Sequence, residues 1–140
     1  MTSKNALTSL VFDNTYAKLP HKFFALLHPA TVKSPTFIKL NEDLAHDLGL
    51  DVEELQSVAG LHFFAGNLIA EGSQPMAMAY AGHQFGHFSP SLGDGRAHLL
   101  GEMLDKQSQR FDIQLKGSGQ TPFSRRGDGK SALGPVIREY

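Results

Sequence analysis

The stretch from residue 97 to residue 116 constrains the fold most, because it carries the pattern of two β-strands joined by a short polar turn. Residues 110–116 alternate polar and apolar side chains, which is typical of a strand with one buried face. Residues 97–104 form a mainly apolar run of strand length, and the polar residues 105–109 separate the two runs. The sequence therefore predicts an antiparallel hairpin.

Helix signals precede this hairpin, so the predicted fold class is α+β. Residues 41–49 combine an Asn cap, early acidic residues and a Gly stop, which together predict a helix. Asp51 and Glu54 have the spacing of a capping box, which predicts a second helix that ends by Gly60. Two further short helices are expected, over residues 21–28 and 75–82.

A last helix is predicted after the glycine-rich segment that follows the hairpin. Ser131 is expected to cap this helix, and Pro135 falls in its first turn. Tyr140 follows Glu139 without any helix stop signal. We therefore expect these 140 residues to be part of a longer domain.

Composition excludes several classes of protein. The net charge of −1 argues against a generally basic nucleic-acid binder, and the lack of cysteine excludes a disulfide scaffold, a thiolate zinc site and a thiol nucleophile in this sequence. No apolar run reaches the roughly 18 residues of a membrane span, and no secretory signal is recognisable. We therefore expect a cytoplasmic protein that has neither membrane nor nucleic acid as a partner.

The charge is unevenly distributed along the chain, and this points to a local anion site. Residues 1–95 contain five Lys and nine acidic residues, a net charge of −4, whereas residues 96–140 contain eight basic and five acidic residues, a net charge of +3. Eight of the fourteen Gly lie between Gly93 and Gly134. Backbone donors and cations in one segment favour phosphate binding.

Three phosphate-binding patterns can be tested against this segment. Gly129-Lys130-Ser131 ends like a Walker A loop, but Ser124 stands where the first Gly is required and no buried strand precedes it. A dinucleotide-binding fingerprint over residues 127–132 fails for the same reason. The third pattern is that of a protein-kinase N-lobe: a Gly turn, a strand with Lys116 and a helix with Glu139. By spacing alone, a solvated Lys at the end of a strand is the favoured explanation of Lys116.

Longer strings in the sequence resemble the selenoprotein O (SelO) family over nearly the whole chain from residue 12. They are FDNTYAKLP (12–20), MAMAYAGHQFGHF (76–88), LGDGRAHLLGE (92–102), DIQLKGSGQTPFSRRGDGK (112–130) and IREY (137–140). The resemblance implies a protein-kinase-like fold, of which residues 1–89 would be a mainly helical and extended N-terminal segment. Residues 90–140 would be an incomplete N-lobe.

The resemblance also implies an activity. The family is described as pseudokinases that bind ATP in a flipped orientation and transfer AMP to Ser, Thr or Tyr hydroxyls of proteins, with Mg2+ or Mn2+. The resemblance assigns the nucleotide to Gly93, Gly95, Arg96, Lys116, Asp128 and Gly129, and makes Glu139 the partner of Lys116. It places the general base and the metal ligands after Tyr140, so residues 1–140 alone are expected to be inactive.

Other readings of the sequence stay open. His83 and His87 are four residues apart, so they are either metal ligands on one helix face or structural residues packed near the loop. Arg125 and Arg126 either contact a phosphate or lie on the surface. An ATP-dependent protein kinase is the alternative activity, and a non-catalytic nucleotide- or nucleic-acid-binding module is the alternative of another class.

Overall fold

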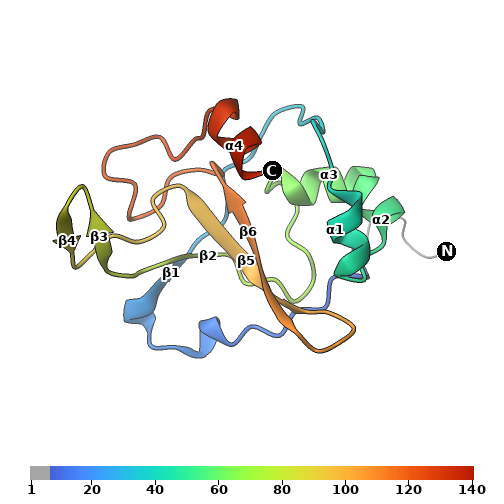
Figure 1. Ribbon diagram of the computed structural model, residues 1–140, viewed down its shortest axis with the longest axis horizontal. Coiled ribbons are helices and arrows are strands. Elements are labelled where there is room, and N and C mark those ends of the chain that lie inside the picture. The colour runs from blue at the N-terminus through green and yellow to red at the C-terminus, as the bar shows by residue number, and fades with distance from the viewer. Residues whose placement is uncertain (1–6) are drawn as a thin grey trace.

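A computed structural model describes residues 7–140, and its centre is a four-stranded antiparallel sheet (Figure 1). The strand order is β1-β2-β5-β6, and every neighbouring pair is antiparallel. The strands are β1 (Phe24–Leu26), β2 (Met76–Met78), β5 (Ala97–Leu104) and β6 (Arg110–Lys116). The α+β class is therefore confirmed. The sheet joins strands from both sides of residue 90, and the division of the chain at residue 89 stays a prediction.

The predicted hairpin is confirmed as β5 and β6. Its register runs from Ala97 opposite Lys116 to Leu104 opposite Arg110, with one irregularity between Leu99 and Gly101. The apolar side chains of β6 pack into the core, and its polar ones lie on the opposite, exposed face. The alternation in the sequence thus reflects one buried face, as expected.

Three short helices lie together at one end of the sheet (Figure 1). They are α1 (Glu42–Asp47), α2 (Val52–Gln56) and α3 (Val58–Phe64). The prediction of a helix over 41–49 is confirmed, and the Asn41 side chain caps α1 by accepting from the N–H of Leu44 at 3.0 Å.

The second predicted helix is corrected in two respects. The backbone turns extended at Ser57 (ψ 170°), which ends α2, and Ser57 then caps α3 by accepting from Gly60. Gly60 therefore lies inside a helix instead of ending one. Asp51 does cap α2, but Glu54 does not complete the capping box. Its carboxylate accepts hydrogen bonds from the backbone and hydroxyl groups of Thr8 and Ser9.

The two other short helices predicted before the hairpin are wrong. Residues 21–28 contain only a 3-10 turn, η2 (His21–Phe23), followed by strand β1. Residues 75–82 contain β2, because Met76 and Ala77 are needed in the sheet, where they are almost fully buried between β1 and β5. Tertiary burial overrides the helix propensity of Met and Ala here. The remaining short elements are η1 (Tyr16–Lys18), β3 (Gly82–Gln84) and β4 (His87–Ser89).

The core lies on both faces of β5. On one face, Leu100 and Met103 pack with Ala59 and Phe63 of α3. On the other face, Leu99 packs with apolar side chains of β1 and β2. This double burial fixes β5 as the central element of the fold, and each buried side chain of this size contributes about 1.5–3 kcal/mol.

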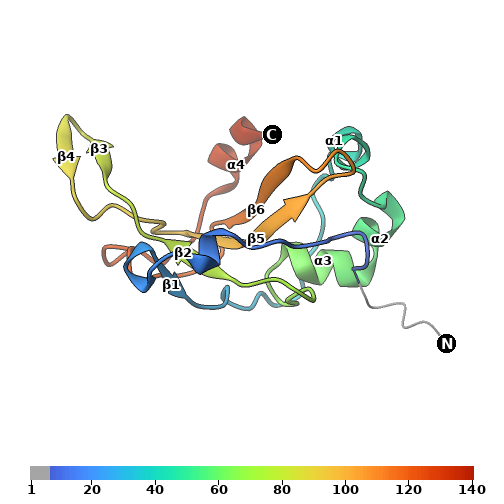
Figure 2. The same ribbon diagram turned by 90° about the horizontal axis from the view of Figure 1, so that it is seen from below.

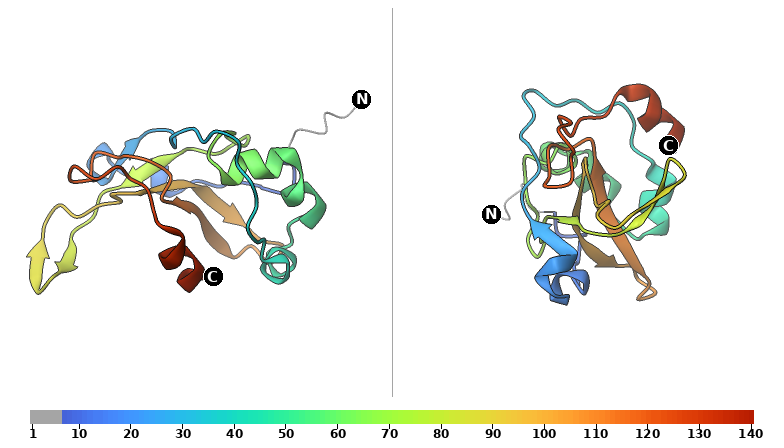
Figure 3. Two further views of the ribbon diagram at one scale, coloured as in Figure 1. Left: turned by 90° about the horizontal axis from the view of Figure 1, so that it is seen from above. Right: turned by 90° about the vertical axis from the view of Figure 1, so that its left-hand side faces the viewer.

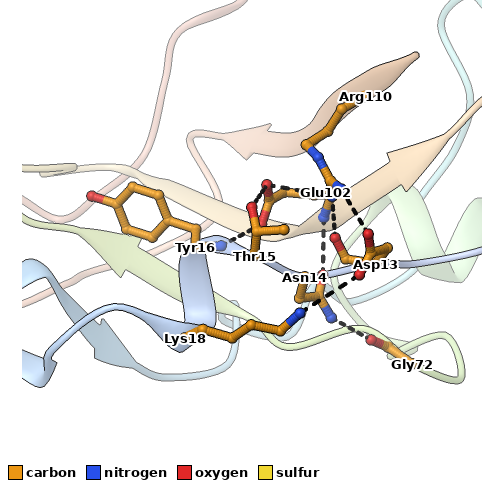
Figure 4. A network of polar contacts seen from close by, with 8 residues as sticks. All are labelled: Asp13, Asn14, Thr15, Tyr16, Lys18, Gly72, Glu102 and Arg110. Atoms are coloured by element: carbon orange, nitrogen blue, oxygen red, sulfur yellow. Dashed lines mark hydrogen bonds and ion pairs between the residues drawn. The ribbon is translucent and has the colours of Figure 1, made fainter. Parts of the chain in front are cut away.

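The start of the segment 12–20 runs antiparallel beside β5, where Phe12 pairs with Met103, and a polar network fastens the segment to the strand (Figure 4). The carboxylate of Glu102, only 5% exposed, accepts from the Thr15 hydroxyl at 2.6 Å and from the Tyr16 N–H at 2.5 Å. Asn14 accepts from the Glu102 N–H at 3.0 Å, and Arg110 pairs with Asp13 at 2.6 Å. The string FDNTYAKLP is therefore fastened to both β5 and β6 by side-chain contacts.

Gly101 makes this close approach possible. A Cβ atom at this position would lie 2.5 Å from a ring carbon of Phe12 and 2.7 Å from the side-chain oxygen of Asn14. A side chain on Gly101 would therefore push the segment 12–20 away from the strand.

The last helix is α4 (Leu133–Glu139), which stands on the same side of the sheet as the β3–β4 hairpin (Figures 2 and 3). Pro135 lies in its first turn, as expected. The predicted cap is wrong: the helix begins at Leu133, two residues after Ser131, so Ala132 occupies the N-cap position, and its methyl side chain cannot accept a capping bond. None of the helices described in residues 7–140 has the length and apolar character needed to cross a membrane.

Candidate functional site

The turn of residues 93–96 forms the first wall of the site, directly before β5. The N–H groups of Leu92 and Gly93 donate to the Tyr80 carbonyl at 2.8 and 3.1 Å, which ties the turn to the end of β2. Gly93 has a φ of +64°, and a Cβ atom there would lie 2.7 Å from a ring carbon of Phe123. Only glycine fits this conformation and this contact without strain.

Asp94, between the two glycines, is a buried anchor that the sequence analysis missed. Asp94 is only 6% exposed. Its carboxylate accepts hydrogen bonds from the Met78 N–H (3.0 Å), the Tyr80 hydroxyl (3.0 Å) and the Gln114 amide (3.3 Å). Burial and then the hydrogen bond to Asp94 raise the pKa of Tyr80. Asp94 thereby joins the turn to β2 and β6. No local signal distinguishes it from an ordinary Asp-Gly turn residue.

The loop of residues 117–132 forms the second wall, and hydroxyl groups hold it against the turn. Thr121 donates to the Asp94 carbonyl at 2.5 Å, and Ser124 donates to the Gly95 carbonyl at 2.6 Å. At the start of the loop, the Ser118 hydroxyl pairs with a ring nitrogen of His98 at 2.7 Å, and burial lowers the pKa of this histidine. The loop is therefore fixed to the sheet although it has no regular structure.

Asp128 and Gly129 lie at the far end of this loop. Gly129 is buried with a φ of +71°, packed against the backbone of Gly119, whose N–H donates to the Gly129 carbonyl at 3.1 Å. The exposed Asp128 side chain accepts from the Lys130 N–H at 2.9 Å. The close approach of the two backbones explains why this position is a glycine.

Two adjoining grooves run along these walls, and together they contain every residue that the sequence predicted for the site. The first, of about 530 Å³, is lined by Gly93, Gly95, Arg96, Asp128 and Gly129 among others. The second, of about 520 Å³, is lined by Gly95, Arg96, Lys116 and Glu139 among others. Gly95 and Arg96 belong to both grooves, so they form the junction between them.

Lys116 and Glu139 form the predicted ion pair in the second groove. Their side chains are 41% and 54% exposed, so the contact is screened by water and is worth about 0–1 kcal/mol for stability. The pair joins the end of β6 to α4, and Arg96 lines the same groove as both of its residues.

The grooves combine cations with aromatic rings. Arg96, Lys116, Arg125 and Lys130 line them, against the acidic Asp94, Asp128 and Glu139, and so do Tyr80, Phe85 and Phe123. Arg125 lines the first groove, so a phosphate contact stays possible for it in geometric terms. Arg126 is absent from the lining residues. Cations and aromatic rings are the complements of a polyphosphate and a flat base respectively.

His83 and His87 do not share a helix face. They lie on β3 and β4 of a hairpin, and the His83 ring packs against Phe88 at 5.3 Å between centroids. Within residues 7–140 no group of three or more His, Cys, Asp or Glu side chains has the arrangement of a metal site.

Comparison with known proteins shows the family. The family model described as "Protein adenylyltransferase SelO" matches residues 6–140. The chain belongs to the SelO family. The resemblance seen in the sequence is thereby confirmed, from the strings around the grooves to the segment 12–20 near the N-terminus.

Curated members of the SelO family are similar over almost the whole chain. A protein named "Protein nucleotidyltransferase YdiU" from Rhizobium etli is 64% identical over 132 residues, which are 94% of this chain and 26% of that protein. Proteins of the same name from Bradyrhizobium and Alkalilimnicola ehrlichii are 62% and 60% identical over 129 residues, which are 92% of this chain and 26% of theirs. The chain thus spans about a quarter of the length of these relatives.

Proposed function

We propose that the whole protein transfers AMP from ATP to Ser, Thr or Tyr hydroxyls of other proteins. The observation that carries the proposal is the gathering of seven residues from four separate parts of the chain around two adjoining grooves, in a member of the SelO family. A Gly turn, a strand Lys and a helix Glu in this order also support a protein-kinase-like N-lobe.

Each residue has a proposed role in holding the nucleotide. Gly93 and Gly95 let the backbone come close to the phosphates, and Arg96 and Lys116 offset their negative charge. Glu139 holds the Lys116 ammonium in place, as it does in the structure. Asp128 and Gly129 contact the nucleotide from the second wall, where the tight backbone packing keeps the loop rigid.

The chemistry is a single displacement at phosphorus. With ATP flipped relative to its orientation in kinases, the α-phosphorus faces the incoming hydroxyl. The hydroxyl oxygen forms a bond to the α-phosphorus, the bond to the bridging oxygen breaks, and pyrophosphate leaves while a general base takes the hydroxyl proton. The residues described here bind, orient and neutralise charge, which are the main contributions of a protein to such a transfer.

The metal and the general base are proposed to come from the part of the whole protein outside residues 1–140. Within residues 7–140 no three His, Cys, Asp or Glu side chains are arranged as a metal site, so the proposal gives these residues the nucleotide and not the metal. We accordingly propose that residues 1–140 alone lack transfer activity.

A label-transfer experiment tests the proposed activity. Whole protein is incubated with a substrate protein and ATP labelled at either the α- or the γ-phosphate. Transfer of AMP deposits only the α-label, whereas a protein kinase deposits only the γ-label and would refute the proposal. Binding of RNA with a steep salt dependence, and without competition from ATP, would instead identify a nucleic-acid module.

A further inference from the structure

The tip of the β3–β4 hairpin carries an aromatic residue that the fold itself does not need. Phe85 and Gly86 form the two-residue turn between Gln84 and His87, with φ values of +55° and +79°. Positive φ at both positions defines a turn that favours Asn or Asp first and Gly second, and disfavours a bulky side chain. Phe85 is also 87% exposed, so it contributes almost nothing to the core.

The location of Phe85 gives it a different use. Gln84 and Phe85 line the first groove, together with Arg125, Asp128 and Lys130 of the loop. The hairpin projects from the body of the molecule on the side where α4 stands (Figures 2 and 3). Phe85 therefore lines the groove of the proposed nucleotide site from the tip of a projecting hairpin, and most of its surface is free to contact a ligand.

The other exposed aromatic residue of this hairpin, Phe88, does not line the groove. Phe88 is 60% exposed, packs against His83 across the two strands, and is absent from the groove lining. Phe123, which does line the groove, is already in use, because its ring packs under Gly93. Phe85 is thus the aromatic ring at the groove that has no structural partner among the described residues.

We propose that Phe85 is a positioning residue that contacts the base of the bound nucleotide, with the hairpin tip covering that base. A nucleotide needs cations for its phosphates, which the loop and Arg96 provide, and a flat apolar surface for its base. Stacking on an exposed aromatic ring provides such a surface. The inference rests on the proposed function, since it requires a nucleotide in this groove.

The test compares three variants of the whole protein by calorimetric titration with ATP and with inorganic triphosphate, both with Mg2+. Phe85→Asn removes the ring and favours the turn, so the hairpin is retained. Phe85→Tyr keeps a stacking surface, and Phe88→Ala is the matched control on the same hairpin. The expected result is that Phe85→Asn weakens ATP binding about 10- to 100-fold without changing triphosphate binding, while the other two stay within about twofold of the unsubstituted protein.

The other outcomes overturn the inference in distinguishable ways. Equal weakening of ATP and triphosphate binding by Phe85→Asn would show a general effect on the groove and not a base contact. Unchanged ATP affinity with reduced transfer to protein would assign Phe85 to the protein substrate. If the unsubstituted protein binds neither ligand, the proposed function fails as well, whereas ATP binding that is indifferent to all three variants refutes only the role of Phe85.

Discussion

Replacement of Asp94 by Ala tests whether this buried carboxylate holds the site together. The substitution leaves the N–H of Met78 without its acceptor. The other two groups that contact Asp94, the Tyr80 hydroxyl and the Gln114 amide, are themselves donors to the lost carboxylate. Tyr80 and Gln114 can turn to water, so most of the loss comes from one backbone donor and the missing charge. A loss of about 2–3 kcal/mol in local stability is expected, since hydrogen bonds to charged groups contribute about 1.5–3 kcal/mol.

Hydrogen exchange in the whole protein measures this loss directly. The Leu92 amide donates to Tyr80 and reports on opening of the turn, so its exchange should accelerate about 30- to 150-fold in Asp94→Ala. Asp94→Asn should accelerate it only about fivefold, because its amide can donate to the Tyr80 hydroxyl while its oxygen still accepts from Met78. ATP affinity should fall in the same order.

The control is Asp47→Ala, which removes an exposed carboxylate from the end of α1. It should change neither the exchange of Leu92 nor the affinity for ATP. Equal exchange rates in Asp94→Ala and Asp47→Ala would refute the reasoning, because the turn would then be held without the carboxylate.

Three further predictions concern the sheet and the ion pair. Gly101→Ala should destabilise the protein by about 1–3 kcal/mol in urea denaturation, whereas Gly134→Ala, which meets open space in a helix, should be neutral or stabilising by up to about 1 kcal/mol. Burial alone would raise the pKa of Glu102, but its hydrogen bonds and the nearby guanidinium outweigh burial and lower it. The contribution of Glu102 to the free energy of unfolding is therefore fully present above its ordinary pKa of 4.5 and is lost as the pH falls through the lowered pKa. Glu102→Gln should accordingly flatten the acid limb of a stability-versus-pH curve, and an unchanged limb would contradict this. Lys116→Ala and Glu139→Gln should each reduce AMP transfer at least tenfold and change stability by less than about 1 kcal/mol, and loss of folding in either would disprove a purely positional role.

The elements that the sequence predicted well are those whose pattern is local. The β5–β6 hairpin follows from an alternation in seven residues, and α1 follows from a cap, early acidic residues and a Gly stop. The site residues stay a prediction from long strings that resemble the SelO family, and the structure gathers them around two adjoining grooves. The ion pair of Lys116 and Glu139 is expected from that resemblance, because the order of strand and helix alone favours a solvated Lys.

The parts that could not be predicted depend on contacts distant in sequence. β2 becomes a strand because β1 and β5 cover it, and nothing in Met-Ala-Met indicates this. Asp94 looks like a turn residue until its three donors, from residues 78, 80 and 114, are brought to it by the sheet. Glu54 likewise leaves its capping box because Thr8 and Ser9 offer it better donors.

The central claim is that the turn of residues 93–96, Lys116 and the loop 117–132 bind one nucleotide. The measurement that tests it most directly is a crystal structure of the whole protein with a non-hydrolysable ATP analogue and Mg2+. We predict that the triphosphate lies at the junction of the two grooves, in contact with Arg96 and Lys116, and that the α-phosphorus faces solvent, where a substrate hydroxyl can approach. A nucleotide bound elsewhere, or one with its γ-phosphate in that exposed position, would contradict the proposed site or the proposed AMP transfer respectively.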